Sequence, residues 1–439
     1  MLISQRNLHG KERQVSVEKK MERIKGLWNK ISYEVIILAI LQFQFLTGRA
    51  LDLQGWSAAW CAMDYSMGTG SRFLIGTIYR LFYGDYLFAS VAYKYVGIGI
   101  MFTITVLALV LGRLLRKAVA VLPSAKHAVL GTVLLYLAAP FSVSYVWNEQ
   151  NLGRLDVYLL LIVLLAILAA LGIKNVYARM AVYTLLGITG LAIHQGFAFL
   201  YYPMILVLMC YDVFCDNQVH IRPLIAAVIS GLLNVAAAVW FQFYSSVNFA
   251  SPEEMVEFLQ QRTNLEISQY AVFLEYFGNM EYQIEHVTKG FFQGDEAPLA
   301  HLLLILLILA PVLALYALVW RDVFRYLRAT GAKLYRTPYV YAALAHLCFV
   351  PMFVIHVDWG RHLAPLFAME IFFFLFYLAK RDRAMVYAYE QMARRIRKYP
   401  WGFVLALVWL AMLDSFGARE FQKQASMLYD FLRYGFHID

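Results

Sequence analysis

A set of ionisable side chains lies at the ends of long apolar stretches, where acid–base and anion-binding groups can act together. The set comprises Asp64, Arg72, Arg154, Asp156, His194, His356, Asp358 and Arg361. An ionisable group costs roughly 2.5 to 3.5 kcal/mol at the centre of a membrane helix, so groups kept at helix ends are candidates for function. Carboxylates accept protons, and the planar fork of an arginine binds phosphates or carboxylates. The set therefore predicts proton transfer beside a bound anion.

The elements that must position these residues are expected to lie in a membrane. The 439-residue chain is 61% hydrophobic and 15% charged, and its mean hydropathy is +0.59, whereas a soluble domain is about 45 to 50% apolar. The apolar stretches approach the roughly 20 residues that cross a hydrocarbon core as a helix, without the alternation of a membrane strand. We therefore expect an all-α fold, a polytopic membrane helical bundle.

The apolar stretches predict about eleven transmembrane helices. They span residues 33–49, 90–112, 128–147, 155–173, 181–194, 197–213, 223–244, 299–320, 338–356, 362–380 and 400–413. Residues 181–194 and 400–413 are short for a full crossing, which leaves a tilted, re-entrant or interfacial placement open for both.

Basic residues concentrate in alternate connections between these spans. These connections are residues 113–127, 174–180, 321–337 and 381–399. The opposite connections are acidic or mixed, above all residues 245–298. Because positively charged loops stay in the cytoplasm, the pattern predicts a cytoplasmic N-terminus. The net charge of +9 is explained by these loops rather than by a basic stripe, so no nucleic-acid partner is expected.

The sequence predicts three parts along the chain. Residues 1–30 are expected to form a basic cytoplasmic segment without a cleaved signal peptide, residues 31–413 the transmembrane domain, and residues 414–439 an amphipathic tail. The transmembrane domain carries two outer loops, residues 50–89 and 245–298. The four cysteines are scattered singly without metal-ligand spacing, so no metal site is assigned.

The first outer loop, residues 50–89, is rich in aromatic residues and is expected to form interfacial helices. The small residues 66–71 predict a turn into a helix that starts near Arg72, with Asp64 at the mouth of the turn. The amides of such a turn can receive a phosphate, and Arg72 adds positive charge. The alternative is an aromatic surface loop in which Asp64 is merely solvated.

Two further polar clusters fall on the same side as this loop. Arg361, beside His356 and Asp358, can grip a phosphate, although a salt bridge in a tight turn is the alternative. Arg154, near Asp156, is a second phosphate candidate, and a helix-capping turn is its alternative.

The remaining polar features have weaker signals. Loop 245–298 has helical apolar spacing, acids and aromatic rings, which suit a sugar-binding cap but also ordinary amphipathic surface helices. His194 ends an apolar span, where a lone histidine is more often a packing residue than a catalytic one. His346 and Glu370 lie deeper; one buried polar contact between them is a possible interpretation, and no role is assigned to either.

The order of these elements resembles the GT-C superfamily of polytopic glycosyltransferases, which use polyprenyl-phosphate-linked sugars on the outer face of the membrane. The likeness rests on the first span, the long outer loop with Asp64, the many later spans and the large late outer loop. The segments DYSMGTGSR and DWGR also look like motifs of membrane proteins in bacterial surface-polysaccharide synthesis. Many relatives carry paired acids in the first loop, whereas Asp64 stands apart from Asp52 and Asp85.

The resemblance implies transfer of a sugar from a polyprenyl-phosphate donor to a glycan or lipid-linked acceptor on the extracytoplasmic face. Asp64 is then the general base. The donor phosphate would be bound by Arg361, Arg154, Arg72 and His356, with Asp358, Asp156 and His194 in supporting roles. No metal ligand is assigned, and a divalent cation stays open as a cofactor.

Other functions fit the same pattern. A surface-polysaccharide polymerase of O-antigen or capsule type needs similar outer arginines, and a lipid-linked sugar flippase would line a pathway with such charges. A purely structural scaffold is disfavoured because the charges cluster on one face. The positive-inside pattern and the lack of targeting features in residues 1–30 favour a bacterial inner membrane over an endoplasmic-reticulum membrane, with membrane lipids as partners.

Overall fold

The structure is a computed structural model that describes residues 31–47, 53, 55–147, 151–278, 280–287, 298–355 and 359–413. Every regular element in these ranges is a helix, so the expected all-α fold is confirmed for them. The predicted N-terminal segment 1–30 and the predicted tail 414–439 lie outside the described residues.

Five helices in these ranges are long and apolar enough to cross a membrane. They are α4 (Ala89–Val121), α7 (Val176–Ile193), α10 (Ile221–Phe243), the Leu306–Ala329 part of α14 (Pro298–Ala329) and the Gly360–Ala379 part of α17 (Trp359–Ala379). An α-helix satisfies its own backbone hydrogen bonds inside lipid, which is why such segments can span it. The five helices support a multi-pass membrane protein, while the predicted number of crossings and the orientation stay predictions.

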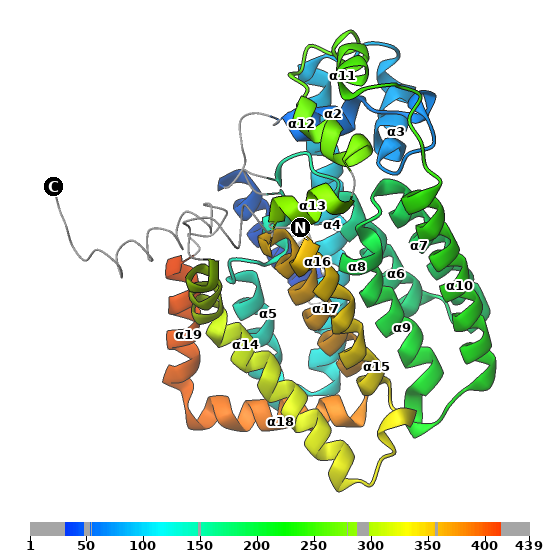
Figure 1. Cartoon of the computed structure of the whole chain (residues 1–439). Helices are drawn as coiled ribbons and strands as arrows, with labels where there is room; N and C mark the ends of the chain where they lie inside the picture. Colours follow the sequence, from blue (N-terminus) through cyan, green and yellow to red (C-terminus); the bar gives the residue numbers. More distant parts are fainter. Residues whose placement is uncertain are drawn as a thin grey trace, which may run out of the picture.

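Shorter apolar helices complete the bundle. They are Ile31–Thr47, α5 (Lys126–Leu137), α6 (Asp156–Gly172), α8 (Phe197–Leu200), α9 (Tyr202–Phe214), α15 (Pro338–Ala345), α16 (Val350–Ile355) and α19 (Pro400–Leu413). The bundle helices run between two ends of the molecule (Figure 1). One end carries α2 (Gly55–Ala62), α3 (Phe73–Tyr83), α11 (Pro252–Gln260) and α12 (Gln269–Val272), and the other carries α18 (Arg383–Lys398).

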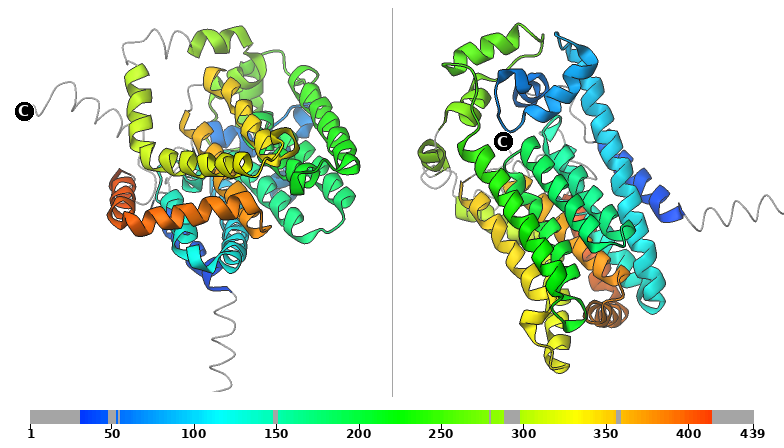
Figure 2. Two further views of the ribbon diagram at one scale, coloured as in Figure 1. Left: turned by 90° about the horizontal axis from the view of Figure 1, so that it is seen from below. Right: turned by 90° about the vertical axis from the view of Figure 1, so that its right-hand side faces the viewer.

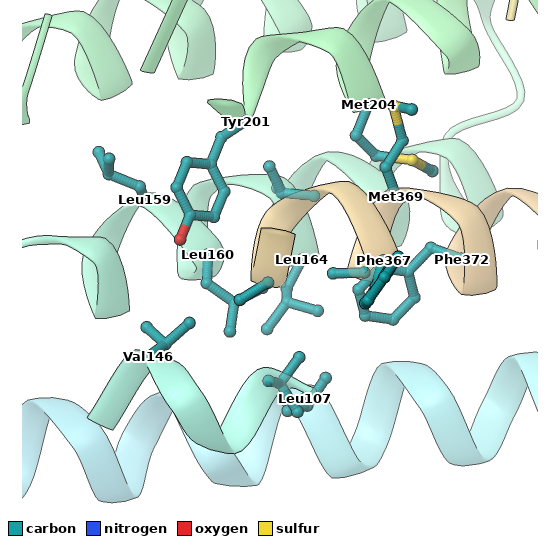
Figure 3. Close-up of a cluster of buried hydrophobic side chains, with 14 of the residues drawn as sticks. Leu107, Val146, Leu159, Leu160, Leu164, Tyr201, Met204, Phe367, Met369 and Phe372 are labelled. Atoms are coloured by element: carbon teal, nitrogen blue, oxygen red, sulfur yellow. The ribbon is translucent and has the colours of Figure 1, made fainter. Parts of the chain in front are cut away.

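The core lies between α4, α6, α9 and α17, where large apolar side chains interlock (Figure 3). Leu107 of α4, Leu164 of α6 and Phe372 of α17 are completely buried. Because lipid tails are as apolar as these side chains, the helices associate through close van der Waals packing rather than through exclusion of water. The packed core fixes the helix ends on which the candidate site is built.

The segment predicted as one span over residues 128–147 is broken. α5 ends at Leu137, and after a turn that contains Pro140 the chain forms the 3-10 helix η3 (Val143–Trp147). Proline lacks an amide hydrogen and its ring clashes with the preceding helical turn, so the α-helix cannot continue through this point. The prediction of a continuous helix here was therefore wrong.

The four connections predicted as basic loops are largely helical. α4 continues to Val121, α7 begins at Val176, α14 continues to Ala329, and most of residues 381–399 form α18, which lies across the end of the bundle (Figure 2). The Asp382 carboxylate begins α18 by accepting hydrogen bonds from the amides of Ala384 and Met385, each at 3.0 Å. Met385 is buried while Arg394 is exposed, so α18 is an amphipathic helix with a basic outer face.

The two outer loops pack together as one unit, which we call the cap and define as residues 55–88 and 245–278. The amide of Thr69 donates to the Ser246 carbonyl at 2.9 Å, and the amide of Leu87 donates to the Arg262 carbonyl at 2.8 Å. Gly68 has a φ of 143°, and a Cβ there would collide with the Ser246 carbonyl oxygen, so only glycine fits this contact.

Both outer loops contain helices, as the sequence predicts, while the placement of these helices at a membrane interface stays a prediction. α2 and α3 lie in the first outer loop, and α11, α12 and α13 (Met280–Val287) lie in the second. The helix expected to start near Arg72 begins at Phe73, which confirms that prediction.

Candidate active site

Arg72 joins the cap to the bundle at the N-terminus of α3. Its backbone is left-handed, with a φ of 78°; such conformations are uncommon for residues other than glycine and cost roughly 1 to 3 kcal/mol. The Arg72 amide donates to the Ala192 carbonyl oxygen near the end of α7 at 3.0 Å, which holds this turn in place. The Arg72 residue is only 5% exposed, so the strained backbone delivers its guanidinium into the boundary between cap and bundle.

The Arg72 guanidinium contacts two side chains from different segments. Its Nη1 forms an ion pair with Oε2 of Glu275, and its Nη2 lies 3.2 Å from Nε2 of His194. Glu275 belongs to η6 (Phe273–Phe277), a π-helical turn of the cap. Because π-helical turns are frequent at functional sites, this contact is a second indication, beside the strained backbone, that the region is functional.

The His194 ring lies between two hydrogen-bond donors. The amide of Gly196 points at Nδ1 of His194 at 2.9 Å, and Nη2 of Arg72, which can only donate, lies 3.2 Å from Nε2. A neutral imidazole has one acceptor nitrogen, so the ring accepts from only one of these two groups at a time. An anion accepts from several donors, so a phosphate oxygen near Nη2 of Arg72 would satisfy the donor that the ring cannot.

Arg361 and Asp156 form a second buried ion pair beside Arg72. Nη2 of Arg361, at the start of α17, lies 3.0 Å from Oδ2 of Asp156, in the first turn of α6. Burial lowers the pKa of Arg72 to about 10, while Tyr276 and Asp156 raise this pKa and Arg361 lowers it. Arg72 thus stays protonated at neutral pH, and its pKa responds to both members of the neighbouring pair.

We call Arg72, Asp156, His194, Glu275 and Arg361 the arginine knot. The positive charges of its two guanidinium groups balance the negative charges of its two carboxylates when His194 is neutral. An anion that displaced Glu275 from Arg72 would meet a locally positive site with preorganised donors. The knot can therefore exchange an internal carboxylate for a phosphate.

Asp64 lies in a different cluster. Its carboxylate accepts from the Ser66 amide at 2.7 Å, from Nη1 of Arg80 at 3.1 Å to each oxygen, and from Nη2 of Arg262 at 2.6 Å. Asp64 is 2% exposed. Burial favours the neutral carboxyl, but hydrogen bonds from Ser66 and Arg262 outweigh it and lower the pKa of Asp64 below its usual range.

The Asp64 cluster and the knot lie toward opposite ends of α3. Arg80 follows Arg72 by eight residues, which is about 12 Å along a helix axis at 1.5 Å per residue. The structure therefore brings together four of the predicted site residues, Arg72, Asp156, His194 and Arg361. It holds Asp64 apart from them, between arginines of the two outer loops.

The structure gives less information on the other predicted site residues, Arg154, His356 and Asp358. Arg154 precedes Asp156 by two residues, and its amide donates to the Asn151 carbonyl at 3.0 Å. His356 and Asp358 lie outside the described residues. Their predicted roles in phosphate binding and support stay predictions.

Three residues of these clusters were not predicted from the sequence. Glu275 is one of many acids in the second outer loop, and nothing in the sequence separates it from the others. Arg80 stands at a helical spacing from Arg72 without a visible partner in the sequence. Arg262 could have been singled out from the sequence, because it is the one lysine or arginine between residues 245 and 287. The acidic residues around it predict that it forms an ion pair.

The deeper residues His346 and Glu370, which the sequence left unassigned, contact each other. His346 Nε2 lies 2.5 Å from Oε1 of Glu370, and the Trp320 indole donates to both Glu370 oxygens at 2.9 and 3.1 Å. Across the residues that the structure describes, no group of three or more His, Cys, Asp or Glu could hold a metal ion. Dependence on a divalent cation stays a prediction.

Comparison with known proteins adds no assignment. No family model, no curated protein and no solved structure matches the chain. The geometry of the knot and of the cap is therefore what indicates a function for this protein.

Proposed function

We propose that the protein is an integral membrane glycosyltransferase that moves a sugar from a polyprenyl-phosphate-linked donor to a glycan or lipid-linked acceptor. The arginine knot carries this proposal, because Arg72 is buried where the cap meets the bundle and Arg361, whose side chain is 15% exposed, lies beside it. A departing lipid phosphate gains negative charge, and preorganised cationic groups in a water-poor site stabilise it.

The proposal places the cap on the extracytoplasmic side of a bacterial inner membrane, with about eleven crossings below it. Its support is the position of the basic segments: α18 and residues 321–337 lie at the end opposite the cap (Figure 1). Positively charged segments are retained in the cytoplasm, so the cap and the knot would face outward. Lipid-linked sugars reach that face with their phosphates at the level of helix ends.

The reaction needs a base for the acceptor hydroxyl. As the acceptor oxygen bonds the anomeric carbon, the bond from that carbon to the phosphate oxygen breaks, and its electrons leave with the lipid phosphate. The hydroxyl proton must pass to a carboxylate. Asp64 is the base implied by the GT-C resemblance, but two arginines hold it and its pKa is lowered, which makes it a weaker base.

We therefore propose that Glu275 is the general base that accepts the hydroxyl proton. This carboxylate rests on Arg72, where the donor phosphate would bind, so donor binding would displace it and free it to accept the proton. Arg72 and Arg361 then hold the phosphate, with Arg154 and His356 as further ligands. Asp156 orients Arg361, His194 orients Arg72, and Asp358 supports them. Asp64 holds the two halves of the cap together.

The test is to purify the protein in lipid and incubate it with a panel of polyprenyl-phosphate sugars and acceptor glycans. Free lipid phosphate is then measured. The proposal expects release with at least one donor, and loss of that release in Arg361→Ala. Absence of release from folded protein with every donor would contradict it.

One observation favours the flippase alternative. Glu370, His346 and Trp320 form a polar contact among the bundle helices, and ionisable groups at such depth often line transport pathways. A flippase would move a fluorescent lipid-linked sugar across a vesicle membrane without consuming it, and His346→Ala would slow that movement. A transferase would release lipid phosphate and leave the movement unchanged.

A further inference from the structure

A groove of about 990 Å³ opens between α14, α18 and α19, away from the cap. α14 and α19 come close together near one end and diverge toward α18, so the three helices frame a triangle (Figure 1). The Trp409 indole donates to the Ile308 carbonyl at 3.1 Å and joins α19 to α14. Leu135 of α5 also lines the groove.

Small side chains leave this groove open. Ala310 and Ala314 line it from α14, and Gly402 and Ala406 line it from α19. A Cβ on Gly402 would meet no atom within 4 Å, so the space beside it is empty of protein. The walls are otherwise apolar, which suits hydrocarbon chains.

Two arginines line the groove near its α18 end: Arg321 of α14 and Arg395 of α18. Nη2 of Arg395 lies 2.5 Å from the fully buried Asp322, whose charge it balances. Arg321 reaches Asp322 only at 3.4 Å, and its side chain is 57% exposed. Two cations thus face one carboxylate. The Arg395 side chain is 27% exposed, and its buried Nη1 finds no acceptor among the described residues.

We propose that this groove binds an anionic glycerophospholipid, with its acyl chains between α14 and α19 and its phosphate at Arg321 and Arg395. Basic pockets between membrane helices bind anionic headgroups when they face the cytoplasmic leaflet. A zwitterionic lipid would fill the apolar walls equally well but would leave the surplus positive charge unmatched. The proposal does not depend on sugar transfer, because the groove and the arginine knot lie toward opposite ends of the bundle.

The test is native mass spectrometry of the detergent-purified protein with equal amounts of phosphatidylglycerol and phosphatidylcholine. The wild type should retain phosphatidylglycerol preferentially. Arg321→Ala should weaken phosphatidylglycerol binding about fivefold, equivalent to about 1 kcal/mol for one arginine near an anionic group, and leave phosphatidylcholine binding unchanged. Arg328→Ala, which removes an exposed arginine of the same helix outside the groove lining, should change neither.

A second variant tests the chain-binding walls. Ala406→Trp should fill the groove and reduce retention of both lipids, while size-exclusion chromatography confirms the same monodisperse protein. Equal retention of the two lipids by the wild type would overturn the proposal. So would a dimer that Ala406→Trp dissociates, because the groove would then hold a second copy of the chain.

Discussion

The Asp64 cluster and the arginine knot use the same residue types near the two ends of α3, yet their geometry differs. In the Asp64 cluster one carboxylate accepts from two arginines and a backbone amide, so its acceptor positions are filled. In the knot two arginines face two carboxylates and a histidine, beside a strained backbone and a π-helical turn. A carboxylate surrounded by donors, such as Asp64, stabilises the fold. An ion pair whose carboxylate an incoming anion can replace, such as Arg72 with Glu275, is suited to substrate binding and proton transfer.

The largest effect is expected from the knot. Arg72→Ala should lower lipid-phosphate release about 10²- to 10³-fold, because it removes a preorganised donor from the developing phosphate charge. Arg72→Lys should retain part of the activity, since it keeps the charge but loses the planar fork. Steady-state release from equal amounts of folded protein measures both. Equal activity of the alanine variant and the wild type would remove Arg72 from the site.

Substitutions in the Asp64 cluster should lower the stability of the cap rather than the catalytic activity. Asp64→Asn leaves Arg80 and Arg262 without their buried counter-charge, and breaking a buried ion pair costs about 3 kcal/mol or more. Limited proteolysis of the cap should accelerate accordingly. Arg80→Ala is the matched control: Arg80 is 34% exposed on its side chain, so its loss should cost about 1 kcal/mol or less. Equal proteolysis of the wild type and Asp64→Asn would show that Asp64 does not hold the cap.

The pH dependence of the cap follows from the same carboxylate. Because folding lowers the pKa of Asp64, its ionised form contributes stability above the unfolded pKa of about 3.9. That contribution is lost as the pH falls through the lower, folded pKa. Proteolysis of the wild-type cap should therefore accelerate below about pH 4, and Asp64→Asn should lack this acid-induced component. An identical acid profile in both proteins would contradict the assignment.

A substitution at Gly68, where the two outer loops meet, should lower the stability of the protein by a smaller amount. Gly68→Ala is expected to cost about 2 to 3 kcal/mol, because the new Cβ would collide with the Ser246 carbonyl in a conformation open only to glycine. Gly84→Ala is the control, since Gly84 has a φ of 81° but open space around it, so only about 1 kcal/mol of backbone strain is expected. Thermal unfolding in detergent would rank them, and equal melting temperatures would show that the collision is relieved elsewhere.

Sequence reasoning grouped four residues of the knot without naming the partner of Arg72. Arg72, Asp156, His194 and Arg361 could be grouped because each stands at the end of an apolar stretch on one side of the bundle. The partner of Arg72 could not be named, because the contact with Glu275 joins residues about 200 positions apart through the fold of the cap. The helix start at Phe73 was predicted from local turn residues, which carry their own signal.

The broken span at Pro140 shows the limit of hydropathy alone. Residues 128–147 are mostly apolar, and apolar character predicts burial without specifying whether one helix runs through. The proline carried the missing information, since it ends the hydrogen-bond pattern of α5. Likewise α18 was missed because its charge suggested a loop, although its apolar residues repeat at helical spacing.

The most direct test of the account compares Glu275→Gln with Asp64→Asn in the lipid-phosphate release assay, at equal amounts of folded protein. Both substitutions remove one carboxylate charge and preserve the shape of the side chain. The account predicts a fall of about 10²- to 10⁴-fold for Glu275→Gln, the usual contribution of a general base, and retained turnover for Asp64→Asn. Full activity of Glu275→Gln with a collapse in folded Asp64→Asn would contradict it and return the base to Asp64.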